Sequence, residues 1–131
     1  TGGAGMKRFC RWWSVVVGAM DASTGLLLVT CPGWVLATLG IAPLPAESGV
    51  LLRWIGVFVG AVGLSYGLAL KGEREGETVW AFTALVRGMV AAFVTMNIMG
   101  GTLEPAWAGA AVTDAGGAVV QVIGLRKRWW R

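Results

Sequence analysis

Four long apolar stretches constrain the fold of this chain more than any other feature of its sequence. They run from Trp12 to Cys31, from Val50 to Leu70, from Thr78 to Met99 and from Pro105 to Leu125. Each has the ~20 mostly apolar residues that a membrane-spanning helix requires. Because only 14% of the chain is charged, too few polar side chains remain to cover a soluble domain. The pattern predicts an integral membrane protein.

The connections between these stretches are short, so consecutive helices are expected to pack side by side in opposite directions. A transmembrane barrel would instead need alternating polar residues and many more strands. We therefore expect an all-α fold, an antiparallel bundle of four transmembrane helices that forms a single domain over residues 1–131. Residues 1–5 are expected to be a non-native remnant ahead of Met6.

A proline is expected to end the first span. Pro32 cannot continue a helix without the loss of a backbone hydrogen bond, and Gly33 adds conformational freedom. The apolar segment 34–41 is too short to cross a bilayer, so we expect a short helix at the membrane interface or folded back on the bundle. Pro43 and Pro45 predict an extended loop after it. The alternative is one long, kinked first helix.

The distribution of basic residues predicts the orientation. Nine Lys and Arg residues lie before span 1, between spans 2 and 3 or after span 4, whereas the opposite side has only Arg53. The positive-inside rule then places both termini in the cytoplasm, in a bacterial inner membrane. The same excess of basic residues on one side accounts for the net charge of +4. We therefore expect the partner to be the lipid bilayer and not a nucleic acid. An aromatic belt is expected on this side from Trp12, Trp13, Trp129 and Trp130.

Three charged residues lie inside the apolar spans at similar depth. At 1.5 Å per residue from the basic side, Asp21 and Arg87 lie roughly 13 Å deep and Asp114 roughly 16 Å deep. An isolated charge costs ~2.5–3.5 kcal/mol at a helix centre, so we expect the three to face inward and pair. Arg87 has enough donors to bridge both carboxylates. Since one negative charge is left over, either one Asp holds a proton near neutral pH or a cation lies beside it.

Polar side chains at helical spacings extend this cluster into a candidate ligand, ion or proton site. The expected members are Asp21, Arg87, Asp114, Thr24, Tyr66, Gln121 and Asn97. The chain has no His, the commonest general base and metal ligand, and two Cys alone cannot make a zinc site. We therefore expect no catalytic residues, no metal and no cofactor.

The second span carries a stripe of glycines. Gly56, Gly60, Gly63 and Gly67 follow one another at steps of four, three and four residues, so they share one helical face. Such a face lets a neighbouring backbone come close. Packing within the chain is the favoured explanation, and a seam between two copies is the alternative.

Several of these features occur together in a known architecture. Gly18 and Gly25 flank Asp21, a break at Pro32 precedes a short apolar segment, and the second and third spans are rich in glycine. In these respects the chain resembles the small four-helix bacterial membrane proteins of the DoxX-like kind. The resemblance implies the fold and no particular activity, because one fold hosts many functions.

Three functions are compatible with this pattern. The favoured one is a transporter, channel or small-ligand-binding bundle, in which Asp21 and Asp114 exchange protons or bind a cation and Arg87 is the counter-ion. The alternative is a structural or accessory subunit of a membrane complex, in which the charges only fix helix packing. A homodimer is compatible with the favoured function. The third, a membrane enzyme with the two carboxylates as acid and base, is the least favoured because nothing positions a substrate. The unbalanced charge favours the first.

Overall fold

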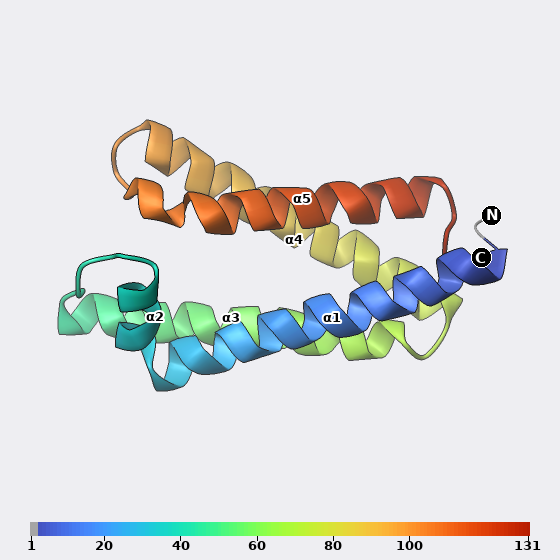
Figure 1. Cartoon of the computed structure of the whole chain (residues 1–131), viewed down its shortest axis with the longest axis horizontal. Helices are drawn as coiled ribbons and strands as arrows, with labels where there is room; N and C mark the ends of the chain where they lie inside the picture. Colours follow the sequence, from blue (N-terminus) through green and yellow to red (C-terminus); the bar gives the residue numbers. More distant parts are fainter. Residues whose placement is uncertain (1–2) are drawn as a thin grey trace.

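The computed structural model describes residues 3–131, and all its regular secondary structure is helical. Thr1 and Gly2, part of the expected non-native remnant, lie outside the described residues. The elements are α1 (Gly3–Thr30), α2 (Pro32–Thr38), α3 (Ala46–Ala69), α4 (Glu73–Met99), the 3-10 turn η1 (Pro105–Trp107) and α5 (Ala108–Arg126) (Figure 1). The prediction of an all-helical chain is confirmed.

Four helical segments are long and apolar enough to cross a membrane. They are α1, α3, α4 and the segment Pro105–Arg126. Their outward-facing side chains are themselves apolar, as at Leu64 and Phe93, which are 73% and 67% exposed. Large continuous apolar surfaces of this kind are rare on soluble proteins. Four such helices suggest a multi-pass membrane protein. Three helices begin ahead of the predicted spans, α1 at Gly3, α3 at Ala46 and α4 at Glu73. The added residues include Ala, Lys, Arg and Glu, which are good helix formers.

The predicted break after the first span is present. Helix α1 ends at Thr30, Cys31 has φ −142° and ψ 63°, and Pro32 occupies the first turn of α2, where its missing N–H is not needed. The alternative of one kinked helix is wrong. Helix α2 is folded back on the bundle, because Leu36 is buried against Leu28 of α1 and Leu52 of α3.

Helices α1 and α3 are in backbone contact along the glycine stripe. A Cβ added to Gly25 would lie 2.6 Å from the carbonyl oxygen of Gly56, and one added to Gly18 would lie 2.9 Å from that of Gly63. Gly60 also lies against Gly25. Gly67 differs, because an added Cβ would meet nothing within 4 Å. Three of the four stripe glycines therefore pack within the chain and Gly67 does not.

The helices form two layers (Figure 1). Helix α1 packs along α3 in one layer, α4 packs along α5 in the other, and α3 contacts α4 between them. At the end where α1 begins, an aromatic cluster joins the layers. It contains Phe9, Trp13, Tyr66, Trp80, Trp129 and Trp130.

Of the four Trp residues expected in an aromatic belt, only Trp12, at 57%, is exposed as a belt residue would be. Trp130 is only 2% exposed, and Trp13 and Trp129 are partly buried in the aromatic cluster. The chain turns after α5 at Arg128, which has a positive φ of 54°, and folds the C-terminus back. The indole of Trp130 then covers Gly76 and stacks edge-on with Trp80, with 5.6 Å between the ring centroids.

Candidate functional site

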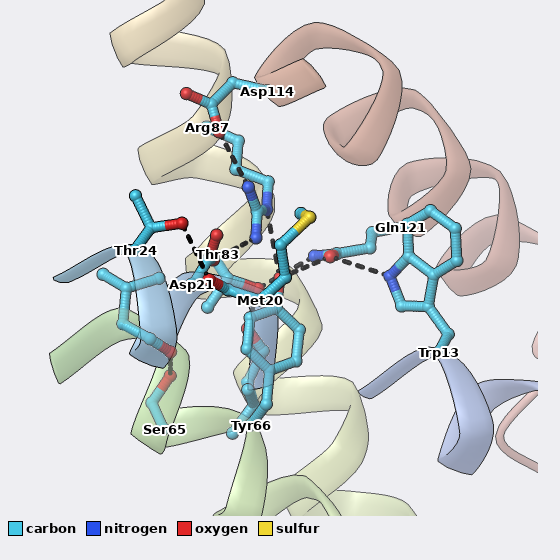
Figure 2. Close-up of polar contacts among 12 residues, drawn as sticks. Trp13, Met20, Asp21, Thr24, Ser65, Tyr66, Thr83, Arg87, Asp114 and Gln121 are labelled. Atoms are coloured by element: carbon cyan, nitrogen blue, oxygen red, sulfur yellow. Dashed lines mark hydrogen bonds and ion pairs between the residues drawn. The ribbon is translucent and has the colours of Figure 1, made fainter. Parts of the chain in front are cut away.

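Arg87 lies at the centre of the bundle and contacts the other three long helices. Its side chain is 4% exposed and forms ion pairs with Asp21 Oδ2 of α1 and, at 2.7 Å, with Asp114 Oδ1 of α5. Its Nε donates to the hydroxyl of Tyr66 in α3 at 3.1 Å (Figure 2). The stem of Arg87 passes close to Gly117, where a Cβ would lie 3.2 Å from Cδ. The prediction that the three charges meet is confirmed.

Gln121 of α5 joins this cluster to a buried hydrogen-bond network. Its Oε1 accepts from the Tyr66 hydroxyl at 2.5 Å and from Trp13 Nε1 at 3.2 Å. Its Nε2 donates to the carbonyl oxygen of Trp80 at 3.0 Å and to Thr83 Oγ1 at 2.8 Å. All four hydrogen bonds available to a side-chain amide are therefore made inside the protein. Figure 2 shows Gln121 between Trp13 and the charged cluster.

A second chain of hydrogen bonds links α4 to α1 next to Gln121. Trp80 Nε1 donates to Ser14 Oγ at 2.9 Å, and the Ser14 hydroxyl donates to the carbonyl oxygen of Cys10 at 2.8 Å. Sequence reasoning missed Trp13 and Trp80 as members of this network. A signal was present, because Trp80 lies three residues before Thr83 and seven before Arg87, which puts all three on one face of α4.

Two predicted site residues lie apart from the cluster. The Thr24 hydroxyl donates to the carbonyl oxygen of Met20 in its own helix at 2.8 Å, and its side chain is exposed. Asn97 donates to the carbonyl oxygen of Phe93 at 2.8 Å and accepts from the Thr102 hydroxyl at 2.7 Å. All three hydrogen bonds are local, as is common for these residue types. The structure thus brings together Asp21, Arg87, Asp114, Tyr66 and Gln121 and leaves Thr24 and Asn97 outside.

The charges of the cluster do not balance. Two carboxylates surround one guanidinium, so the formal charge is −1 with both acids ionised. The side chains of Asp21 and Asp114 remain 13% and 22% exposed, whereas Arg87 is almost fully buried. Within residues 3–131, Asp21 Oδ1 and Asp114 Oδ2 accept no hydrogen bond. The cluster therefore offers oxygen acceptors and one uncompensated negative charge at its partly accessible edge.

This arrangement suits a small monovalent species. The described part of the chain contains no group of three or more His, Cys, Asp or Glu residues that could hold a metal ion. A divalent cation such as Ca²⁺ takes six to eight oxygen ligands in general, far more than two carboxylates with a neighbouring Arg can supply. A proton or a monovalent cation would balance the charge of the cluster.

Comparisons with protein-family models, with curated proteins and with solved structures found no match. The resemblance to DoxX-like proteins stays a prediction. The function is therefore inferred from the geometry of the charged cluster.

Proposed function

We propose that the chain is a protein of the bacterial inner membrane with four antiparallel spans and both termini in the cytoplasm. The glycine contacts support antiparallel packing, because Gly18 of α1 meets Gly63 of α3, while Gly25, later in α1, meets Gly56, earlier in α3. The grouping of Lys and Arg residues on one side of the spans supports the orientation.

Within this bundle we propose a proton- or cation-coupled carboxylate site, as in a small transporter or channel. The observation that carries the proposal is the double ion pair of Arg87, which leaves one negative charge of the Asp21–Arg87–Asp114 cluster uncompensated. Ionisable groups within a membrane mark ion and proton pathways in many proteins, because their insertion cost selects against them elsewhere.

The two ion pairs have different places in the bundle. Asp114 and Arg87 belong to the same layer, α4 with α5, whereas Asp21 belongs to the other layer. A proton or cation on Asp21 weakens its attraction to Arg87 and so loosens the contact between layers. The hydrogen bonds of Gln121 and Trp80 hold the layers together at the end with the aromatic cluster. Binding of a proton or cation at Asp21 would thus favour a movement in which the two layers separate, with the end that contains the aromatic cluster as the hinge.

Flux through the purified protein tests this proposal. The protein is reconstituted in liposomes that contain a pH-sensitive dye, and the dye response to a proton gradient is recorded with and without Na⁺ or K⁺. We expect flux in the wild type and its loss in Asp21→Asn, which keeps the size and hydrogen-bonding capacity of the side chain. Glu75→Gln is the matched control, because Glu75 is exposed and makes no ion pair within residues 3–131. Equal flux in wild type and Asp21→Asn would overturn the proposal.

A second function is favoured by the fully satisfied hydrogen bonds of Gln121. Complete buried networks also serve to fix a single packing arrangement. In that case the chain is an accessory subunit, a homodimer or part of a membrane complex, and the cluster only fixes the layers. This alternative predicts no flux from the isolated protein and a loss of folding in Asp21→Asn as well as in Arg87→Gln.

A further inference from the structure

An open groove of about 240 Å³ lies between α1 and α3. Its walls are formed largely by small and apolar residues, among them Gly18, Ala19, Ala22, Gly63, Gly67 and Leu70. The absence of a side chain on Gly67 leaves part of the groove empty, since a Cβ there would contact nothing within 4 Å. Gly67, the one glycine of the stripe that does not pack against another helix, therefore lines this groove.

A smaller pocket of about 100 Å³ lies beside the basic end of this groove and is lined by Lys7, Arg11, Gly72, Glu73 and Trp130. On α1, Lys7, Arg11, Gly18 and Ala22 follow one another at steps of four, seven and four residues, so they share one helical face. Arg11 Nη1 donates to the carbonyl oxygen of Leu70 at 2.9 Å, and Leu70 also lines the groove. The pocket therefore continues the groove toward the basic end of the helix.

The pocket has more donors and positive charge than the chain itself satisfies. Lys7 is paired with Glu73 at 2.5 Å, but Arg11 faces no acid among the described residues, which leaves a net charge of +1 on the lining. Arg11 has five N–H donors, and within residues 3–131 the one hydrogen bond that its guanidinium donates goes to the carbonyl oxygen of Leu70. A ligand with one negative charge and several oxygen acceptors complements this lining, and a phosphodiester has both.

We propose that the groove and the pocket together bind one anionic phospholipid, with an acyl chain along α1 and α3 and the phosphodiester at Arg11. From Arg11 to Ala22 the pocket and the groove together extend roughly 16 Å at 1.5 Å per residue, about half of the ~30 Å hydrocarbon core. This length matches a single leaflet. The site rests on the proposed insertion in a membrane and does not depend on ion coupling at Asp21.

A second copy of the chain fits the groove less well. The groove lining ends at Ala22, and one turn further Gly25 is already in backbone contact with Gly60. A spanning helix from another copy would need a seam through both leaflets, whereas this groove extends through one. An apolar spanning helix of a second copy would also have no acidic side chain to pair with the basic pocket.

Native mass spectrometry of the full chain, titrated with phosphatidylglycerol in detergent, tests the proposal. We expect one bound phosphatidylglycerol per wild-type chain. Gly67→Leu fills the groove and abolishes the adduct, and Arg11→Gln weakens binding about fivefold, the effect of one basic residue near an anionic surface. Gly88→Leu is the control for the first variant, because a Cβ on Gly88 also meets nothing within 4 Å. Arg74→Gln removes an exposed charge from the first turn of α4 and is the control for the second.

Three results would overturn the site. One is equal phosphatidylglycerol binding by wild type, Gly67→Leu and Arg11→Gln, all verified as folded by circular dichroism. Another is equal affinity for phosphatidylcholine. The third is a lipid-free dimer of the wild type that becomes a monomer in Gly67→Leu, which would assign the groove to a second copy. Extraction of cell membranes with alkaline carbonate tests insertion separately, and flux through Asp21→Asn tests ion coupling separately.

Discussion

Removal of the Arg87 guanidinium is the perturbation whose consequence can be derived most directly from the structure. Arg87→Gln leaves Asp21 and Asp114 without the cation that both now contact. Loss of one partner from a buried ion pair costs about 3–5 kcal/mol, because the remaining charge is left uncompensated. At about 4 °C per kcal/mol for a chain of this length, the melting temperature should fall by about 12–20 °C.

The reasoning is tested by restoring charge neutrality without the arginine. In the triple variant Asp21→Asn, Arg87→Gln and Asp114→Asn, no uncompensated charge remains, and neutral replacements of buried ion triads are often tolerated. We expect this variant to melt above Arg87→Gln alone. The melting of all forms can be followed in detergent by the fluorescence of the eight Trp residues. The charge argument fails if Arg87→Gln has the same melting temperature as the wild type. It also fails if the melting temperature of the triple variant is no higher than that of Arg87→Gln.

Other substitutions follow from the same contacts and can be measured by thermal melting. Gln121→Leu removes four hydrogen bonds, and because each unsatisfied buried group costs ~1–3 kcal/mol, we expect a loss of about 3 kcal/mol or more; an unchanged melting temperature would contradict the role of the amide. Gly25→Ala should destabilise by ~1–3 kcal/mol, because its Cβ would meet the Gly56 carbonyl oxygen at 2.6 Å. Gly67→Ala, with no neighbour within 4 Å, should be neutral or stabilising by ~1 kcal/mol, and an equal effect at both glycines would refute the packing argument.

The sequence predicted the parts of the fold that depend on local chemistry. The lengths of the apolar stretches predicted the four candidate spans, and the backbone chemistry of Pro32 predicted the break before α2. Because the rise per residue of a helix is constant, counting residues along each span predicted that Asp21, Arg87 and Asp114 lie at a similar depth. Pairing then followed from the cost of an isolated charge in an apolar environment.

The remaining features depend on how each helix is rotated and on contacts between distant segments. Thr24 has a helical spacing compatible with the cluster, but its hydroxyl bonds to its own helix and its side chain is exposed. Trp130 is buried because the chain turns at Arg128 and the indole then packs against Gly76. The hydrophobic periodicity of the sequence does not predict this contact between distant segments. The role of Gln121 was visible in its spacing from Asp114, whereas its partners Trp13 and Trp80 required the packed structure.

The central claim is that the uncompensated charge of the cluster makes it a site for a proton or a cation. Asp114→Asn tests this claim most directly, because it balances the charge and leaves the Asp21–Arg87 pair between the layers intact. The decisive measurement is ion flux in liposomes, recorded alongside the melting temperature of the same preparation. The account predicts that flux is lost while Asp114→Asn melts at or above the wild-type temperature. Flux equal to that of the wild type would contradict it.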